Sequence, residues 1–165
     1  MTRMTFQIVL LSGMSLVNMT CAPSKPNPLD QLGTIDVPIK GQPFKLWVAD
    51  SADETERGLM FITHDQMADL PGGVRRGMIF VFASERERSF WMKNTIIPLD
   101  IAYLDSQGKV ISMHTMIALD DRHGQYPSNG AAMYAIEVNA NVYAEIGLAV
   151  GDQIELPTDL HNFTP

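Results

Sequence analysis

The sequence has very little cysteine and little charge. Its 165 residues contain one cysteine, Cys21, which precedes the part of the chain that we expect to fold. A disulfide framework and a catalytic thiol are therefore excluded from that domain, and its stability must come from an apolar core. Charged residues make up 19% of the chain, and acids outnumber bases by 19 to 12. Because nucleic acids are bound by basic patches, this balance argues against a nucleic-acid partner.

The first 20 residues are typical of an export signal. Arg3 is their only charged side chain, and residues 6–17 form an apolar stretch with small polar interruptions. This stretch is too short and too interrupted for a membrane span, and a buried N-terminal helix is the alternative. Because the signal holds one arginine and no acid, its removal changes the formal charge from −7 to −8. We expect an exported protein of the periplasm or the outer cell envelope.

Cys21 stands directly after this signal and before a segment with three prolines at residues 23–28. Such a segment is typical of a flexible tether. A lone cysteine in this position is typical of a bacterial lipoprotein, in which the acylated cysteine becomes the new N-terminus and anchors the chain to a membrane. Ordinary signal cleavage is the alternative. The expected organisation is a signal peptide at residues 1–20, a tether at 21–34 lipidated at Cys21, and a single domain at 35–165.

Short apolar runs between turn signals predict a mainly β domain. Residues 44–48 alternate so that Phe44, Leu46 and Val48 share one face of a strand, while Trp47 points outward. Further strands are expected at residues 77–82, 90–95, 99–104, 109–114, 132–138 and 153–156. Many short strands with few helices indicate a compact β-sandwich or distorted barrel.

Helical signals predict one to three short helices. A capping-box pattern at residues 51–54 predicts a helix over 52–59, ended by a glycine at position 58. The same pattern at residues 63–66 predicts a single turn. A third short helix is expected at residues 141–146, because a glycine follows it.

Residues 89–100, with the sequence SFWMKNTIIPLD, are the most informative stretch. Lys93, Asn94 and Asp100 lie there among aromatic and branched apolar residues. Since charges are almost never fully buried unless they are paired, Lys93 and Asp100 need partners or line a cleft. Strand alternation would place Trp91 and Lys93 on one face and Asn94 on the other.

Several motifs carry a family resemblance. They are Arg57-Gly58-Leu59-Met60, Gly77-Met78-Ile79-Phe80-Val81-Phe82, Phe90-Trp91-Met92-Lys93-Asn94-Thr95, Pro98-Leu99-Asp100, Glu137 in an Ala-Ile-Glu-Val run, and Gly151-Asp152. In this order they resemble the domain-of-unknown-function 192 family over residues 43–156. The resemblance implies a compact, mainly β, often exported domain, and it implies no activity. Relatives hold a cysteine pair in the loop before a late tyrosine, which this chain lacks. Tyr126 matches that tyrosine-centred loop and is expected to close over the central motif.

Two interpretations of the central motif remain open. One is a buried ion-pair network that fixes strand register, with Arg57 as a second cation. Candidate partners of Lys93 are Asp100, Glu137 and Asp152. The other interpretation is a polar cleft beside Trp91, in which Lys93, Asn94 and Arg57 face a small polar molecule or a sugar.

Three classes of function follow. We favour a binding or accessory module that recognises a polar small molecule, a glycan or an envelope partner. Its candidate ligand-binding residues are Arg57, Trp91, Lys93, Asn94, Asp100, Tyr126 and Glu137. A hydrolase with Asp100 and Glu137 as a carboxylate pair is an alternative, although we lean against an enzyme. A purely structural envelope protein with an exposed apolar patch around Trp47 is the third class.

No cofactor or metal is expected. The polar loop contains His114, Asp120, Asp121 and His123, but their spacing fits no metal signature. The serines lack a Gly-x-Ser-x-Gly setting, so a serine nucleophile is not expected. The glycine pair at residues 72–73 precedes an expected strand rather than a helix, which argues against a phosphate-binding loop.

Overall fold

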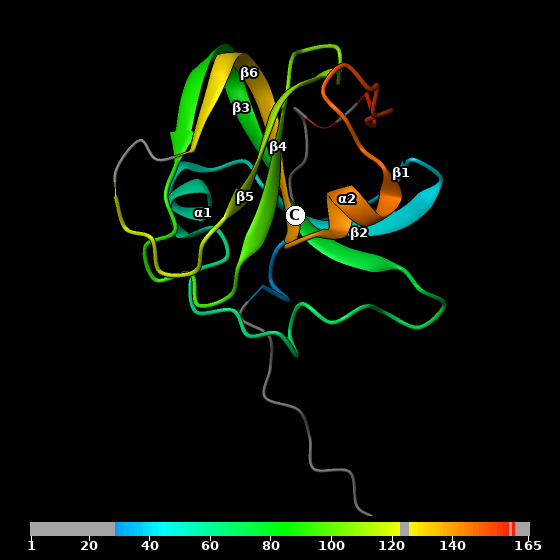
Figure 1. Ribbon diagram of the computed structural model, residues 1–165, viewed down its shortest axis with the longest axis vertical. Coiled ribbons are helices and arrows are strands. Elements are labelled where there is room, and N and C mark those ends of the chain that lie inside the picture. Colours follow the sequence, from blue (N-terminus) through cyan, green and yellow to red (C-terminus); the bar gives the residue numbers. More distant parts are fainter. Residues whose placement is uncertain (1–28, 123–125, 159, 161–165) are drawn as a thin grey trace, which may run out of the picture.

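The structure, a computed structural model, describes residues 29–122, 126–158 and 160. Six strands form one sheet in the order β1-β2-β3-β6-β4-β5, with two short helices beside it (Figure 1). The elements are β1 (Thr34–Ile39), β2 (Gln42–Ala49), α1 (Ala52–Arg57), β3 (Arg75–Phe90), β4 (Leu99–Leu104), β5 (Val110–Met116), β6 (Tyr126–Asn139) and α2 (Val142–Ile146). The predicted mainly β, sandwich-like class is confirmed. Over the described residues the sheet is not closed into a barrel.

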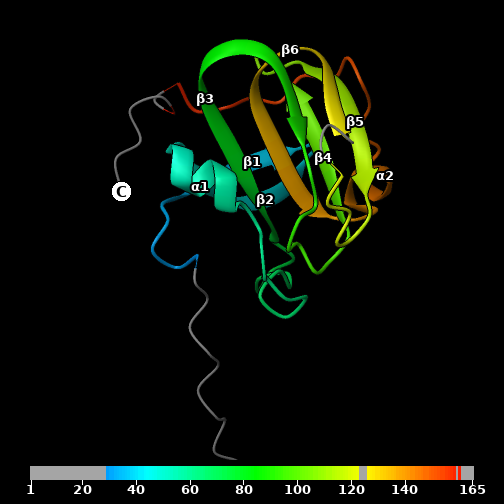
Figure 2. The same ribbon diagram turned by 90° about the vertical axis from the view of Figure 1, so that its left-hand side faces the viewer.

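The long pair of β3 and β6 forms the centre of the sheet. These strands run antiparallel and bend over the top of the molecule (Figure 2). Their register shifts between Val81 and Arg86 and again between Glu87 and Ser89, as at β-bulges, which increase strand bending. The β2–β3 pair is parallel, because the chain crosses over through α1 between these strands. The outer half of β3 thereby lies beside α1.

Both faces of the sheet are buried. Phe44, Leu46 and Val48 share one face, as predicted. They lie in a core with residues of α2, which we call the α2-side core. The opposite face has its own core, here the motif-side core, whose members include Trp47. Trp47 is only 3% exposed, so the predicted outward position of its side chain is wrong. Residues that follow α1, among them Leu59, cover this face.

Local sequence signals set both helices. Ser51 caps α1: its Oγ accepts from Glu54 N at 3.3 Å, and its own N donates to Glu54 Oε2 at 3.1 Å. The helix ends at Gly58, which has a positive φ of 45°. The pattern at residues 63–66 closes one turn, and α2 lies where it was predicted. Capping chemistry is local, which explains why the sequence predicts it well.

Two predicted strands are wrong. The chain leaves β3 at Phe90, and Thr95 N donates to Met92 O at 3.1 Å in a turn. Asn94 in this turn has a left-handed φ of 59°, which an extended strand excludes. Residues 153–156 form only an isolated bridge, between Gln153 and Lys109.

The described chain begins with a buried residue before β1. Leu29 falls within the predicted tether, yet it is buried in the motif-side core. The predicted signal peptide and Cys21 lie outside the described residues. Across the part of the chain that the structure describes, no helix is long and apolar enough to cross a membrane.

Candidate functional site

The central motif forms a loop, residues 91–98, and three of its backbone hydrogen bonds tie it to two other loops. These bonds run from Phe61 N to Asn94 O at 2.8 Å, from Leu119 N to Thr95 O at 2.9 Å, and from Met92 N to Asp120 O at 2.7 Å. Asparagine tolerates the left-handed backbone better than most residues. The turn at Asn94 therefore lets successive carbonyls of this loop bind two other loops. The backbone of the polar motif therefore has a structural role, because it holds the two other loops in place.

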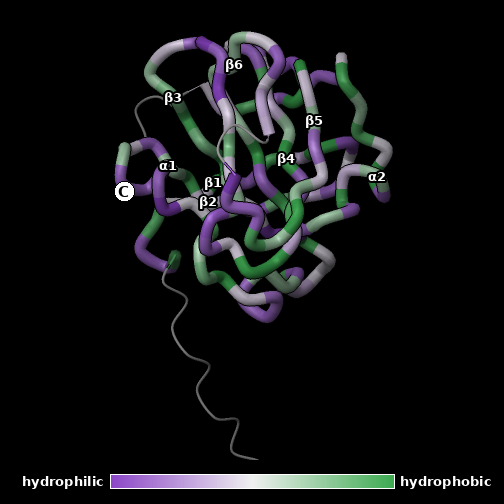
Figure 3. The backbone as a smooth tube through the Cα atoms, turned by 60° about the vertical axis from the view of Figure 1, so that its left-hand side comes forward, coloured by the Kyte–Doolittle hydropathy of each residue, from purple (hydrophilic) through white to green (hydrophobic). Residues whose placement is uncertain are grey.

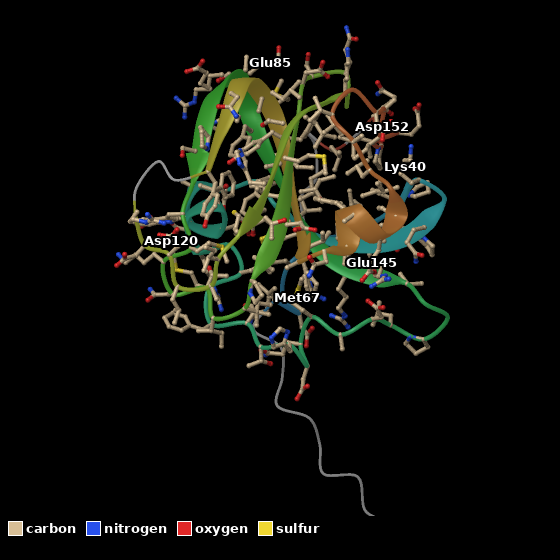
Figure 4. The ribbon with its side chains drawn as sticks, in the orientation of Figure 1. Lys40, Met67, Glu85, Asp120, Glu145 and Asp152 are labelled. Atoms are coloured by element: carbon tan, nitrogen blue, oxygen red, sulfur yellow. The ribbon has the colours of Figure 1, made fainter. Side chains whose placement is uncertain are left out.

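Lys93 is exposed on this loop rather than buried. Its Nζ lies 4.9 Å from the centroid of the Trp91 ring, within cation–π range. The ion pairs between described residues do not include Lys93, so the predicted buried ion-pair network is wrong. Asp152, one of its expected partners, pairs instead with Lys40 at 3.2 Å. Figure 4 shows this pair on the opposite side of the molecule from Asp120, whose carbonyl oxygen binds the motif loop.

Asp100 is buried on the α2 side of the sheet. Its Oδ1 accepts from Thr115 Oγ1 at 2.7 Å, and its Oδ2 accepts from Tyr143 N at 3.2 Å. The second bond satisfies a backbone donor in the first turn of α2, which has no partner within the helix. Asp100 thus fixes α2 against β4 and β5. This is a structural role, and it leaves few acceptor positions for a ligand.

Glu137 lies in the motif-side core, on the opposite face of the sheet. It pairs across β3 and β4 with Met78 and Ile101, whereas Asp100 pairs with Val138. Neighbouring positions on a strand point to opposite faces, so the structure does not bring the two carboxyls to one site. Glu137 is 4% exposed, and burial raises its pKa to about 8. It forms no ion pair with any described residue.

Tyr126 supports the loop beside the motif. It is buried at the start of β6, and its hydroxyl donates to Asp120 Oδ2 at 3.1 Å while accepting from Ile117 N at 3.0 Å. Burial raises the pKa of Tyr126. Arg122 also binds the Asp120 carboxylate through two hydrogen bonds, at 2.7 and 2.6 Å, which lower the pKa of Asp120 to about 2. The Tyr126 hydroxyl therefore binds the loop that contains Ile117 and Asp120, and this loop is in turn bound to the motif loop.

The possible metal ligands do not converge in the described part of the chain. Asp120 is occupied by Arg122, and His114 Nε2 lies 2.7 Å from the carbonyl oxygen of Pro127. His123 lies outside the described residues. Among the described residues, no group of three or more histidine, cysteine, aspartate or glutamate side chains is placed to hold an ion.

Figure 2 shows α1 beside β3. A groove beside Trp91 is lined by residues of α1 and of the outer half of β3. It consists of two adjoining hollows of about 430 and 460 Å³. The residues that line both hollows are Thr55, Glu56, Phe82, Arg86 and Arg88. The first hollow also contacts Glu87, Ser89, Phe90 and Trp91. Arg57 lies elsewhere, in a smaller hollow of about 280 Å³ that it shares with Leu29 and Leu32.

Two arginines, Arg86 and Arg88, place guanidinium groups in this groove. Arg88 stacks over Phe82 with 3.5 Å between its Cζ and the ring centroid, and its Nε donates to Ala132 O at 3.2 Å. Burial and the charge of Arg86 lower the pKa of Arg88. Within the described residues neither arginine forms an ion pair, so Arg86 keeps its donors for other partners.

Sequence reasoning found Trp91 but missed the rest of the groove. The strand was expected to end at Phe82, whereas β3 continues to Phe90 through the run Ser84-Glu85-Arg86-Glu87-Arg88-Ser89. Charged residues in alternation between aromatic residues are the signal that could have indicated it. Of the candidate residues, only Trp91 lines the groove, with Lys93 stacked on its ring.

Known proteins resemble the chain in sequence and in structure. Residues 35–156 match a family described as Uncharacterized ACR. A protein of unknown function from Novosphingobium aromaticivorans superposes with a TM-score of 0.66 and 27% identity, covering 88% of this chain and 100% of that one. A Sinorhizobium meliloti protein described as a proposed transcription regulator superposes with a TM-score of 0.62 and 27% identity, covering 73% of this chain and 89% of that one. No curated protein matches the chain.

Proposed function

Because the chain belongs to the DUF192 family, which is described as uncharacterized, we propose a function from the groove itself. The domain is a binding module for a polar, hydroxyl-rich small molecule, and a glycan of the cell envelope fits this description best. One observation carries the proposal. The groove combines the aromatic side chains of Phe82, Phe90 and Trp91 with the guanidinium groups of Arg86 and Arg88.

The chemistry of the groove suits a sugar ring. A sugar presents an apolar face and a rim of hydroxyl groups, and specific sites combine aromatic surface with a few fixed polar groups. Trp91 and Phe82 supply that surface, Arg86 supplies donors, and Glu56 and Glu87 supply acceptors. Each hollow also falls within the range of about 300–1,000 Å³ usual for small-molecule sites.

Tryptophan fluorescence tests this proposal. The chain has two tryptophans, of which Trp47 is buried and Trp91 lines the groove. In a Trp47→Phe variant, Trp91 is the sole tryptophan emitter. We expect a saturable change in its emission on titration with at least one member of a panel of oligomers of N-acetylated amino sugars and neutral hexoses. Flat titrations across the whole panel would contradict the proposal.

Two substitutions localise the binding. Arg86→Ala removes a charged donor from the groove, and we expect binding to weaken by about tenfold or more, since hydrogen bonds to charged groups contribute about 1.5–3 kcal/mol. Lys109→Ala is the matched control, because Lys109 is an exposed cation directly before β5 and lines neither hollow of the groove. Equal affinities of the two variants would place the binding outside the groove.

We also propose that the chain is exported and anchored in the cell envelope through lipid on Cys21. Support comes from the apolar stretch at residues 6–17 and from the lone cysteine that follows it. Growth with an alkyne-tagged fatty acid tests this location. We expect the wild-type chain to carry the tag and the Cys21→Ser variant to lack it. An untagged wild-type chain contradicts the anchor and favours ordinary signal cleavage.

A further inference from the structure

Exposed apolar side chains gather in three loops. Of the large apolar side chains that the described residues leave exposed, four belong to these loops: Phe61 at 65%, Ile96 at 44%, Ile117 at 66% and Leu119 at 61%. The fifth, Val150, lies apart from them in the turn after α2. Exposed apolar residues scattered singly are ordinary, but a group of them marks an interaction surface.

Hydrogen bonds hold these loops side by side. Phe61 N and Leu119 N donate to successive carbonyls of the motif loop, those of Asn94 and Thr95, and Ile96 is the next residue. Ile117 lies two positions before Leu119, and its own N donates to the Tyr126 hydroxyl. We call Phe61, Ile96, Ile117 and Leu119 the apolar loop patch.

The backbone of the patch is strained. Phe61 has a φ of 62° and Leu119 a φ of 61°, in the left-handed region that bulky side chains rarely adopt. Each side chain nevertheless points into solvent, so packing inside the domain does not offset the cost of this backbone conformation. Strain of this kind persists where the surroundings impose it, and it gathers at functional surfaces.

The first described residue packs in the same core as residues beside this patch. Leu29, the first described residue, is buried in the same core as Leu59 and Ile62, the residues on either side of Met60 and Phe61. In Figures 1 and 2 the first described residues and the three loops lie in the lower half of the molecule. Figure 3 shows apolar segments, in green, among the loops in the lower part of the domain.

The distance from the proposed anchor is short. Cys21 precedes Leu29 by eight residues, which span at most about 29 Å when fully extended. A lipid on Cys21 would therefore hold this end of the domain next to the bilayer.

We propose that the apolar loop patch inserts into the surface of the bilayer that carries the anchor. This inference rests on the lipid anchor proposed above. Phenylalanine, isoleucine and leucine side chains favour the boundary between headgroups and acyl chains. Lys93, beside the patch, can extend its ammonium to lipid phosphates. Asp120, next to Leu119, is already bound by Arg122. Because the whole chain is acidic, with a net charge of −7, apolar contact rather than charge must supply the binding.

Quenching by labelled lipid tests the insertion. The full chain is purified from membranes with its anchor and reconstituted into vesicles of phosphatidylethanolamine and phosphatidylglycerol that contain nitroxide-labelled lipid. Because acylation occupies Cys21, Ile117→Cys provides a single thiol for a fluorophore. Val150→Cys is the matched control, because Val150 is 62% exposed and lies outside the patch. We expect the lipid to quench most of the emission at position 117 and little at position 150.

The outcomes separate the patch from the anchor. Flotation of the protein with the vesicles reports the anchor alone. If the protein does not float with the vesicles, the proposed anchor is wrong, and so is the proposed insertion. Protein that floats with equal quenching at positions 117 and 150 overturns the insertion and leaves the anchor standing. A label at 117 that is shielded from water without being quenched by the lipid also overturns it and points to a protein partner. Ile96→Cys offers a second labelling site if the first variant fails to fold.

Discussion

Burial changes the chemistry of Glu137. The side chain lies in the motif-side core between Met78 and Ile101, its cross-strand neighbours. Burial raises the pKa of Glu137 to about 8, so the carboxyl is protonated at neutral pH. A neutral acid can occupy an apolar core at much lower cost than a carboxylate. The same reasoning makes Glu137 a poor candidate for a nucleophile or a ligand group.

Glu137 is expected to make the domain less stable as pH rises. The unfolded chain loses this proton near the ordinary pKa of 4.5, whereas the folded chain keeps it up to about 8. Between these values the folded state binds more protons, so the free energy of unfolding falls by up to about 1.4 kcal/mol per pH unit. The contribution is fully present below pH 4.5 and is lost as the pH rises through about 8. Urea unfolding of Glu137→Gln, which stays neutral, should lack this component of the slope.

The control for this prediction is Asp36→Asn, because Asp36 is an exposed carboxylate on β1. It should leave the wild-type pH dependence of unfolding almost unchanged. A Glu137→Gln variant with the full wild-type slope would show that another group binds the proton.

Lys93 should contribute little to stability. Its side chain is exposed and meets the Trp91 ring in a contact worth about 0.5–1 kcal/mol at such sites. We therefore expect Lys93→Met, which keeps the stem and removes the charge, to change the free energy of urea unfolding by less than about 1 kcal/mol. A loss of about 3 kcal/mol or more would instead reveal a buried acid that depends on Lys93.

The sequence predicts contacts between near neighbours and misses distant ones. The Ser51–Glu54 cap is visible because its partners are three residues apart. Asp100 and its donor at Tyr143 are 43 residues apart, and no pattern links them. Lys93 was misplaced because its apolar neighbours suggest a buried strand, whereas the left-handed residue at Asn94 turns the chain. Nothing in hydrophobic periodicity reports a left-handed backbone.

At the scale of elements, β3 and β6 meet closely at Gly77. A Cβ built at this glycine would lie 2.5 Å from Glu137 O and 2.9 Å from Leu46 Cδ2 and Val138 Cγ1. Backbone cannot give way as a flexible side chain can, so Gly77→Ala must separate the two strands. We expect a loss of about 1–3 kcal/mol in urea unfolding, typical of overpacking.

Gly130 on β6 is the matched control. Its added Cβ would meet only Ile111 Cδ1, at 3.6 Å, which is an ordinary contact. Gly130→Ala should therefore be tolerated or slightly stabilising, since alanine reduces the freedom of the unfolded chain. Equal losses in both variants would indicate that general strand effects, and not the close approach at Gly77, decide the cost.

The sequence predicts an element best where a single pattern, such as an apolar run, identifies the whole element. The strand expected over residues 99–104 has the same bounds as β4, because it is an apolar run, interrupted only by Asp100, that is buried on both faces. The outer half of β3 was missed, because its charged residues face solvent or the groove beyond the core. The groove depends on that missed half, so the candidate site could be predicted only at Trp91.

At the scale of the whole molecule, the two cores share one sheet. Ile136 on β6 belongs to the α2-side core, while its neighbours Ala135 and Glu137 face the motif side. No described linker or break separates the two sets of side chains along the strand. Damage to one core must therefore weaken strands that also carry the other, and we expect the domain to unfold as one unit.

Ile136→Ala tests this coupling. Truncation of the fully buried isoleucine should cost about 2–5 kcal/mol. In a Trp91→Phe background, Trp47 is the only tryptophan and reports on the motif-side core. We expect Ile136→Ala to lower the urea midpoint measured by Trp47 emission as much as the midpoint measured by far-ultraviolet circular dichroism. Gln107→Ala, at an exposed turn residue, should move neither. If the Trp47 midpoint stays in place while the dichroism midpoint falls, the cores unfold separately, because a shared sheet requires the two transitions to shift together.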